Sequence, residues 1–409
     1  MQNIKKVVLA YSGGLDTSVI IRWLIENYRC EVIAACVDLG SLEGGEKSFD
    51  AVKRKALATG AKKCYIIDGK KEFASDYIFP ALKARAVYEG RYLLATSLAR
   101  PLIADKIIEI AKKEKADAVS HGATGKGNDQ VRFEIGFRTL MPGVKIIAPW
   151  REWDIRSRED AIDYAKQYSI PVPVTKSKPY SSDANMWHIS YEGGILEDLV
   201  NPYPEDMFQI TVSPQDAPNK PQKIEIGFEK GEPASLNGRK LSPVKLIAEL
   251  NAIGGKNGVG RIDIVENRLV GMKSRGVYEC PAAVILYAAH KELESLTLDR
   301  ETYHFKETLV PLMGKLIYNG LWFSTLRQSL SVFIDETQKY VTGSIALELY
   351  KGNIRVISRK TPNSLYWEKL STFGYSGEQV YDHKDSEGFI KLFGLPHTVE
   401  SYLRKHKKK

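Results

Sequence analysis

Residues 10–18, AYSGGLDTS, bring together residue types that bind phosphate. Gly13 and Gly14 let the backbone turn tightly and approach an anion. Three hydroxyl donors accompany them, those of Ser12, Thr17 and Ser18. Asp16 would repel phosphate unless a cation lay between them, which predicts Mg²⁺ chelated by ATP. The alternative is a glycine turn before a capped helix, but the strand, turn and helix context favours phosphate binding.

A second glycine-rich stretch, SHGATGKGNDQVRFEIGFR at residues 120–138, contains Gly122, Gly125 and Gly127. Its polar side chains are Thr124, Lys126, Asn128, Asp129 and Arg132. Such a loop suits a second phosphate or carboxylate contact, and an arginine can hold a carboxylate with two parallel hydrogen bonds. The alternative is a flexible surface loop before a capped helix. His121, alone at a strand end, is explained equally well by packing and by catalysis.

Hydrophobic periodicity places both stretches directly after strands. Apolar strands are expected at residues 6–11, 31–38, 63–68, 117–122 and 145–149. Amphipathic helices are expected at about 17–28, 46–59, 71–88, 97–115 and 157–168. This alternation predicts an α/β fold, a doubly wound parallel sheet with helices on both faces. Ligands bind such sheets at the carboxyl ends of the strands, where both stretches lie.

After about residue 170, a proline-rich segment introduces a mixed α+β region. Strands or hairpins are expected at 208–213, 223–238, 261–272 and 339–360, with hairpin turns at Lys230–Gly231 and Gly352–Asn353. Helices are expected at about 243–253, 281–295, 300–320 and 326–337. We therefore expect three parts: a nucleotide-binding domain at 1–170, a second domain at 171–365, and an arm with a helix at 366–409.

The last helix, expected at 386–409, has an unpartnered apolar face, which predicts docking on another subunit. This face consists of Phe389, Leu392, Phe393, Val399 and Leu403. The net charge is +9, of which the final six residues, RKHKKK, carry five positive charges. The tail is therefore expected to be solvated, with nucleic acid not expected as a partner.

Composition excludes several other classes of protein. The chain has 409 residues, 43% of them hydrophobic, with no apolar run long enough to span a membrane. The amino terminus MQNIKKVV lacks the features of a signal peptide, so we expect a cytoplasmic protein without a membrane partner. The four cysteines, Cys30, Cys36, Cys64 and Cys280, have neither zinc-site nor disulfide spacing.

The first stretch differs from a Walker A loop because no lysine follows its glycines. It resembles the PP-loop of enzymes that cleave ATP between the α- and β-phosphates. Together with RYLLATSLARP, IAPWRE, HISYEGG and GRIDIVENRLVGMKSRGVYE, both stretches resemble the argininosuccinate synthase family over nearly the whole chain. The resemblance implies a cytoplasmic ligase that acts in arginine biosynthesis and the urea cycle. It also implies a homo-oligomer, specifically a homotetramer. The implied reaction condenses citrulline and aspartate with ATP, releasing AMP and pyrophosphate through citrullyl-AMP.

The resemblance also implies site residues. ATP would bind Ala10, Tyr11, Ser12, Gly13, Gly14, Leu15, Asp16, Thr17, Ser18, Val37 and Gly122. Citrulline would bind Tyr92, Ser97, Asn128, Arg132, Ser181, Ser190, Glu266 and Tyr278. Aspartate would bind Thr96, Thr124, Asn128 and Asp129. Catalytic roles fall to Asp16, Asp129 and Lys126, and Mg²⁺ would arrive with ATP, with Asp16 as its one candidate protein ligand.

One segment departs from the family pattern: VDLGSLEGGEKS has Ser41 where the family usually has glutamine, followed by Gly44 and Gly45.

Two other functions stay open. A tRNA-modifying PP-loop enzyme would use the same loop, although the sequence has neither the cysteine pair of thiolases nor a basic strip interleaved with aromatics. A non-catalytic ATP-binding module would bind ATP without forming AMP.

Overall fold

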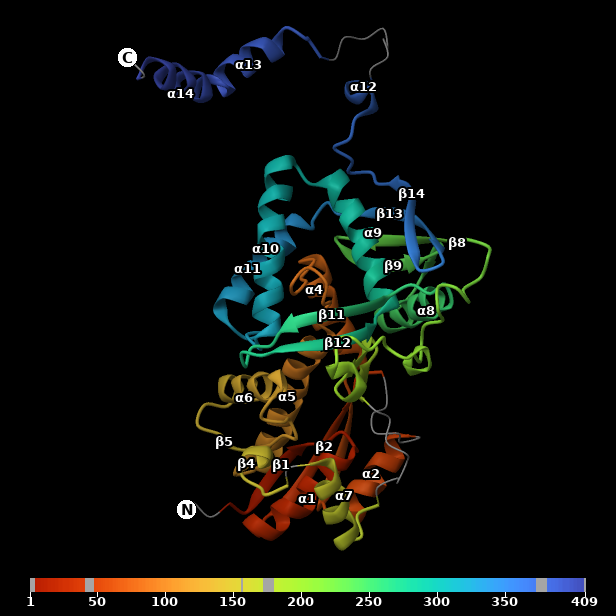
Figure 1. Ribbon diagram of the computed structural model, residues 1–409, viewed down its shortest axis with the longest axis vertical. Helices are drawn as coiled ribbons and strands as arrows, with labels where there is room; N and C mark the ends of the chain where they lie inside the picture. Colours follow the sequence, from red (N-terminus) through yellow and green to blue (C-terminus); the bar gives the residue numbers. More distant parts are fainter. Residues whose placement is uncertain (1–3, 41–47, 156, 172–179, 373–380, 408–409) are drawn as a thin grey trace. The chain divides into compact units, whose positions relative to one another are not determined.

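The structure is a computed structural model that describes residues 4–40, 48–155, 157–171, 180–372 and 381–407 (Figure 1). The departure at Ser41, Gly44 and Gly45 lies outside these residues. The chain forms two compact units, Met1–Asn363 and Ser364–Lys409. Within the described residues, no helix is both long enough and apolar enough to cross a membrane.

The first unit begins with a five-stranded parallel sheet in the order β3-β2-β1-β4-β5. Its strands are β1 (Lys6–Ala10), β2 (Glu31–Asp38), β3 (Lys63–Asp68), β4 (Ala118–Ser120) and β5 (Lys145–Ile147). The helices of this region are α1 (Leu15–Tyr28), α2 (Phe49–Ala58), α3 (Lys70–Glu72), α4 (Phe79–Lys83), α5 (Ala95–Glu114), α6 (Asn128–Leu140) and α7 (Arg158–Gln167). The doubly wound α/β prediction is therefore confirmed.

Alternation along β1 explains why helices cover both faces of this sheet. Val7 and Leu9 are fully buried in a core shared with α1 and α2. Val8 and Ala10 point to the opposite face and join a core with α5 and α6. Successive strand residues face opposite sides, so an unbroken apolar strand requires two covering layers.

The remainder of the first unit contains two antiparallel sheets. A four-stranded sheet in the order β11-β12-β7-β6 contains β6 (Ser181–Asn185), β7 (His188–Glu192), β11 (Arg261–Asn267) and β12 (Lys273–Glu279). A five-stranded sheet in the order β10-β9-β8-β13-β14 contains β8 (Gln222–Glu229), β9 (Glu232–Leu236), β10 (Arg239–Lys240), β13 (Gly343–Tyr350) and β14 (Asn353–Lys360). The helices are α8 (Pro243–Lys256), α9 (Pro281–Thr297), α10 (Arg300–Tyr318) and α11 (Thr325–Thr337).

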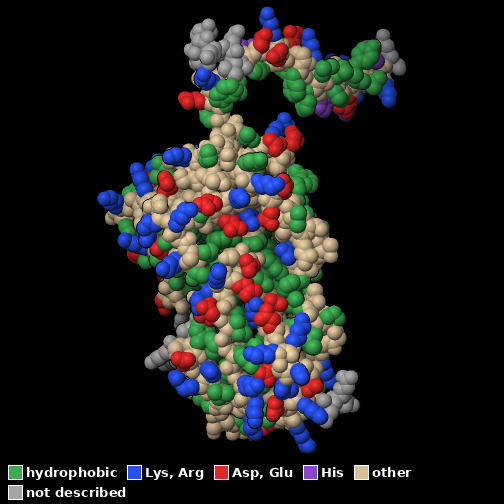
Figure 2. All heavy atoms as spheres, turned by 180° about the vertical axis from the view of Figure 1, so that it is seen from behind, with side chains coloured by type: hydrophobic (Ala, Val, Ile, Leu, Met, Phe, Trp, Pro, Cys, Tyr) green, Lys and Arg blue, Asp and Glu red, His purple; other side chains and the backbone are tan. Residues whose placement is uncertain are grey.

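The second unit contains α12 (Glu368–Ser371), α13 (Asp385–Phe393) and α14 (Leu395–His406). The single helix expected at 386–409 is therefore two helices, separated at Gly394. The expected apolar face is exposed within this unit, from Val399 and Leu403 at 49% to Leu392 at 75%. Figure 2 shows hydrophobic side chains exposed on the surface of this unit.

Three further expectations were wrong in detail. The helix expected at 71–88 is interrupted by a π-helical segment, Phe73–Ile78, and α4 ends before Arg85, whose φ is +47°. The strand expected at 261–272 ends at Asn267, because Gly271 at φ +93° closes a turn into β12. The second hairpin turns at residues 351–352, one residue earlier than expected.

The strand expected at 208–213 is absent, because a carboxylate binds its backbone. Glu279, fully buried on β12, accepts hydrogen bonds from the N–H groups of Gln209, Ile210 and Thr211 at 2.7–2.9 Å. The hydroxyls of Thr211 and Tyr191 donate to the same carboxylate at 2.7 and 2.5 Å. These amides are therefore not available to a strand partner, which sequence periodicity could not reveal.

Replacing Glu279 by glutamine is expected to lower the free energy of unfolding by about 3 kcal/mol, because an amide NH₂ would face buried donors. Urea denaturation measures this change. Glu229→Gln is the matched control: this side chain is 60% exposed and pairs with Lys240, so a change within about 0.5 kcal/mol is expected. Equal stability of the two variants would contradict the organising role of Glu279.

Candidate active site

The turn between β1 and α1 has the geometry of an anion-binding loop. Gly13 has φ +85°, and a Cβ there would approach Val52 Cγ2 to 3.1 Å. Gly14 precedes the first turn of α1 in an extended conformation. Ser12 Oγ lies 3.3 Å from the Gly14 nitrogen and 3.2 Å from Thr17 Oγ1. The hydroxyls therefore gather where the positive end of the α1 dipole is directed.

Two buried side chains, those of Ser18 and Lys55, hold the backbone of this loop through hydrogen bonds. Ser18, fully buried, donates from Oγ to the Gly14 carbonyl at 2.7 Å and lies 3.1 Å from the Tyr11 hydroxyl. Lys55 reaches over from α2 and donates to the Gly13 carbonyl at 2.7 Å. Lys55 is only 6% exposed, so its ammonium stabilises the loop backbone from inside the protein.

A cavity of about 320 Å³ lies at the carboxyl ends of β1, β2 and β4, and its size suits a small-molecule ligand. On the sheet side it is lined by Ala10, Tyr11, Ser12, Gly14, Leu15, Asp16, Thr17, Val37 and Gly122. On the other side it is lined by Arg100, Asp129, Ser181, Asp183, Ser190 and Glu192. The expected ATP residues thus line the cavity, except Gly13 and Ser18, and the cavity continues toward residues expected to bind amino acids.

Arg100 joins three elements at this cavity. Its Nε contacts Asp129 Oδ2 at 2.8 Å, and its Nη2 pairs with Asp183 of β6. Asp129 also accepts from Arg132 Nη1 at 2.9 Å. Two guanidinium groups thus neutralise the carboxylates, and the site can receive a charged amino acid without a large uncompensated charge.

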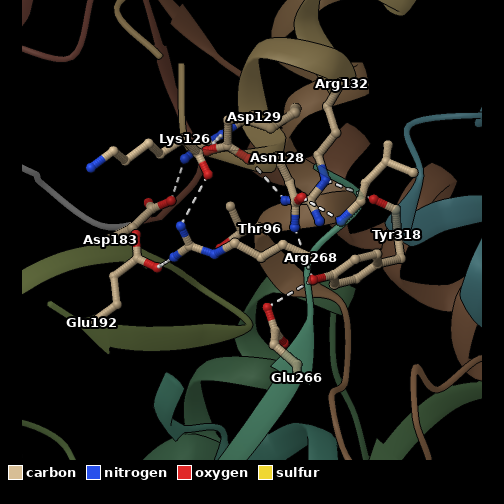
Figure 3. A network of polar contacts seen from close by, with 12 residues as sticks. Thr96, Lys126, Asn128, Asp129, Arg132, Asp183, Glu192, Glu266, Arg268 and Tyr318 are labelled. Atoms are coloured by element: carbon tan, nitrogen blue, oxygen red, sulfur yellow. Dashed lines mark hydrogen bonds and ion pairs between the residues drawn. The ribbon is translucent and has the colours of Figure 1, made fainter. Parts of the chain in front are cut away.

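A directed chain of hydrogen bonds runs inward from Asn128 (Figure 3). Asn128 Nδ2 donates to the Tyr318 hydroxyl at 2.8 Å, and that hydroxyl donates to Glu266 Oε1 at 2.9 Å. The backbone N–H of Leu269 donates to Asn128 Oδ1 at 2.8 Å. Since the Leu269 amide can only donate and Glu266 accepts, the orientation of the Asn128 amide is fixed at both atoms.

Aromatic rings surround this chain. The Tyr92 ring lies 4.9 Å from Tyr278 and 5.9 Å from Tyr318 between centroids, and Tyr278 donates to Glu266 Oε2 at 3.2 Å. Burial raises the pKa of Glu266, although the Tyr318 hydrogen bond opposes the change. Burial also raises the pKa of Tyr92 to about 12, so its hydroxyl stays protonated at neutral pH.

Arg132, 4% exposed, is already engaged within the protein. Its Nε donates to the Tyr318 carbonyl at 2.9 Å, and its guanidinium carbon lies 4.8 Å from the Tyr318 ring centre. With Nη1 also bound to Asp129, the remaining Nη1 and Nη2 hydrogens are those left for a substrate carboxylate. The side chain is therefore held in one orientation before any ligand arrives.

The other expected residues differ in exposure. Thr124 and Lys126 are exposed, and the Lys126 side chain extends away from the polar network in Figure 3. Ser97 is fully buried on α5 and does not line the cavity. Ser190 lines it and donates to the Asp183 carbonyl at 3.2 Å.

Arg268, in the turn after β11, connects the glycine-rich loop to β7. Its Nη1 donates to the Lys126 carbonyl at 3.2 Å, and its Nη2 contacts Glu192 Oε2 at 2.5 Å (Figure 3). Through these bonds the four-stranded sheet holds the loop that follows β4. This arrangement brings residues far apart in sequence to one site.

His188 is buried beside Thr96, one of the residues expected to bind the substrate aspartate. Its Nε2 lies 2.9 Å from Thr96 Oγ1, and its ring stacks on Tyr278 with centroids 5.6 Å apart. Burial lowers the pKa of His188 to about 4. The folded protein therefore holds a neutral imidazole at pH 5, whereas the unfolded chain protonates it below about 6.5.

Stability is consequently expected to fall between about pH 6.5 and pH 4, because the unfolded state binds the extra proton. In His188→Gln, the loss of unfolding free energy between pH 7.5 and pH 5 should be smaller than in the wild type by about 2 kcal/mol. Urea denaturation at both pH values measures it. His304→Gln, at an exposed position on α10, is the control and should retain the wild-type pH dependence.

Sequence reasoning missed several residues of this site: Lys55, Arg100, Asp183, His188, Glu192, Arg268 and Tyr318. Arg100 and His188 lie inside motifs that were recognised, RYLLATSLARP and HISYEGG, so those motifs carried a usable signal. Tyr318 gave none, because an aromatic residue in an amphipathic helix is normally a core residue.

Of the described residues, no group of three or more His, Cys, Asp or Glu could hold a metal ion.

Comparisons with known proteins agree over almost the whole chain. Residues 6–171 match the family described as "Arginosuccinate synthase N-terminal HUP domain", and residues 180–400 match "Arginosuccinate synthase C-terminal domain". Identity to the argininosuccinate synthase of Endomicrobium trichonymphae is 63% over 402 residues, covering 98% of this chain and 96% of the relative. The relative from Caldanaerobacter subterraneus subsp. tengcongensis is 59% identical over 404 residues, which cover 99% of this chain and 97% of the relative. The relative from Clostridium novyi is 57% identical over 400 residues, which cover 98% of each chain. The chain therefore belongs to the argininosuccinate synthase family.

Proposed function

We propose that this protein is an ATP-dependent ligase of arginine biosynthesis that condenses citrulline and aspartate to argininosuccinate. AMP and pyrophosphate are the other products. Family membership supports the reaction. The structural observation that carries it is one cavity bounded by a phosphate-binding loop on one side and by Asp129, Ser181 and Ser190 on the other.

The chemistry follows from the poor reactivity of citrulline. Nitrogen lone pairs feed its ureido carbon, so direct attack by an amine is slow. The ureido oxygen attacks the α-phosphorus of ATP and displaces pyrophosphate, which gives citrullyl-AMP and turns that oxygen into a good leaving group. The amine of aspartate then displaces AMP. The protein contributes by holding the reactants close and stabilising the developing charge.

The site residues divide by chemistry. The loop N–H groups and the hydroxyls of Ser12 and Thr17 hold the phosphates, and Val37 packs on the nucleotide. The buried group of Tyr92, Arg132, Glu266 and Tyr278 receives citrulline, supported by Ser97, Ser181 and Ser190. Thr96, Thr124, Asn128 and Asp129 receive aspartate, with Asp129 accepting from its ammonium group. Lys126 is exposed and free to turn toward departing pyrophosphate.

Magnesium fits this site only as a companion of ATP. Mg²⁺ commonly uses one or two carboxylates together with substrate phosphates and water. Asp16 is the cavity carboxylate in the first turn of α1, next to the phosphate loop. Asp16 would hold the ion, which supplies charge neutralisation at the phosphates.

We further propose that the protein is a cytoplasmic homo-oligomer, specifically a tetramer, with α13 and α14 docking on another copy. The exposed apolar side chains of these helices support this assignment. On the face shown in Figure 2, Lys and Arg side chains are interspersed with Asp and Glu over the first unit, which does not favour a nucleic-acid partner. Light scattering of the full chain tests the oligomer.

The reaction is tested by measuring AMP and pyrophosphate from Mg-ATP, with citrulline and aspartate supplied separately and together. Formation of both products only with the two amino acids together, or pyrophosphate exchange with citrulline alone, is the expected result. ATP binding without either reaction would contradict the proposal. Transfer RNA would then be the next substrate to try, and failure with tRNA would favour a non-catalytic ATP-binding module.

A further inference from the structure

We infer that His121 is a positioning residue that fixes the backbone of Gly122 and Ala123 against the phosphate-binding loop. Its significance for catalysis rests on the proposed function, whereas its effect on ATP binding does not. His121 follows β4 and is fully buried. Gly122 and Ala123 line the cavity, and His121 does not. The imidazole therefore acts on a ligand through the next two residues.

Hydrogen bonds at both ring nitrogens define one tautomer. His121 Nδ1 lies 3.2 Å from the backbone nitrogen of Ala123, which can only donate. Nε2 lies 3.4 Å from Glu134 Oε1 on α6. The Glu134 carboxylate also pairs with Arg151 at 2.6 Å. Nδ1 is therefore the acceptor and Nε2 carries the proton, because the partner of each nitrogen sets its role.

The state of Glu134 supports this assignment. Its hydrogen bond to His121 and the charge of Arg151 lower the pKa of Glu134 against the opposing effect of burial. An ionised carboxylate only accepts hydrogen bonds, so it requires the donor on Nε2. The ring is further held by stacking on Phe133, with centroids 5.6 Å apart and planes inclined by 13°.

The position of Gly122 matters because the residues after the phosphate loop leave no space for a side chain there. A Cβ at Gly122 would come within 2.9 Å of Thr17 Cγ2 and 3.4 Å of Ile20 Cδ1. The backbone of Gly122 therefore lies close against Thr17 and Ile20 of α1. The hydrogen bond to His121 Nδ1 restrains the same backbone one residue later, so the two restraints together set the cavity wall beside Thr17.

The same histidine connects the two halves of the site. Phe133 and Glu134 belong to α6, whose first residues are Asn128 and Asp129. His121 therefore joins the nucleotide side, through Ala123, to the helix that carries the amino-acid side. This resolves the choice left open by the sequence: His121 is packed, but its packing serves the site.

Three substitutions separate the two ring nitrogens. In His121→Asn, the amide oxygen lies two bonds from Cβ, as Nδ1 does, and can still accept from Ala123. In His121→Gln, the polar atoms lie where Nε2 was, so only the Glu134 contact can persist. His121→Leu retains neither. We expect ATP binding, measured by calorimetry, to weaken about tenfold in the Leu and Gln variants and by less than about threefold in the Asn variant.

A purely structural role predicts a different result. The inference would be overturned if the Asn and Gln variants bound ATP equally well, or if only the Gln variant kept an ATP affinity near that of the wild type. Lower thermal stability of the variants with unchanged ATP affinity would also overturn it. If His121→Leu does not fold, the comparison of Asn with Gln decides alone. Kinetics add a second readout: KM for ATP should rise in the Gln variant more than KM for citrulline.

The wild type separates this inference from the proposed reaction. Wild-type protein that binds ATP but forms no AMP with citrulline and aspartate contradicts the reaction only. The ATP affinities of the His121 variants still test the positioning role in that case.

Discussion

Replacing Asp16 by asparagine is expected to lower the rate of AMP formation about 10²–10³-fold, the range seen when one preorganised charge-stabilising group is removed. Asp16 lines the cavity in the first turn of α1. A neutral amide is a weaker ligand for a divalent cation, so the charge of the phosphates is less well compensated. Initial-rate measurements of AMP formation test this expectation.

Asp50→Asn is the matched control, because Asp50 also lies in the first turn of a helix, α2, but is exposed and outside the cavity lining. Its activity should stay within about twofold of the wild type. Binding measurements give a sharper criterion. Without magnesium, Asp16→Asn should bind ATP more tightly, since a repelling charge is gone; with magnesium it should bind more weakly. A change in the same direction under both conditions would contradict the metal role.

Replacing Arg132 by lysine is expected to raise KM for citrulline about 100-fold while changing KM for ATP by less than about threefold. Lysine keeps the charge but cannot bind the Tyr318 carbonyl, Asp129 and a substrate carboxylate at once, as the planar guanidinium can. Arg132 lies outside the lining of the ATP cavity, which explains the expected selectivity. Steady-state kinetics with each substrate varied in turn measure both constants.

Arg138→Lys provides the control on the same helix. Arg138 is 66% exposed and lies 3.7 Å from Glu134, so little change in either KM is expected. A parallel rise in both constants for Arg132→Lys would indicate a general loss of structure and would contradict a specific role in citrulline binding. Thermal unfolding of both variants shows which explanation holds.

The nucleotide-binding region was predictable because its determinants are local. Unbroken apolar strands such as β2 require helices on both faces, and the glycines and hydroxyls of residues 12–18 mark the loop at the strand end. The boundaries of β1 and β2 differ from expectation by no more than one residue. Local periodicity therefore sufficed for the sheet and for the position of the glycine turn between β1 and α1.

The amino-acid side depended on contacts between distant segments. Tyr318 and Asn128 are 190 residues apart, and Leu269 and Asn128 are 141 apart, so no local pattern joins them. Strand β6 went unrecognised because its sequence, SSDAN, lacks the apolar alternation of an ordinary strand. The false strand at 208–213 had the opposite cause: its pattern was suitable, but Glu279 binds its amides.

The fixed amide of Asn128 has a consequence for redesign of substrate choice. Asn128 is the residue assigned to both amino acids, and Leu269 and Tyr318 determine which of its atoms donates and which accepts. A substitution that alters one subsite cannot rotate the Asn128 amide without breaking its hydrogen bond to Leu269, in the turn after β11, or to Tyr318, on α10. Altered substrate choice would therefore have to begin at residues to which we assign only one amino acid, such as Ser181 or Thr124, with the shared asparagine and its two supports retained.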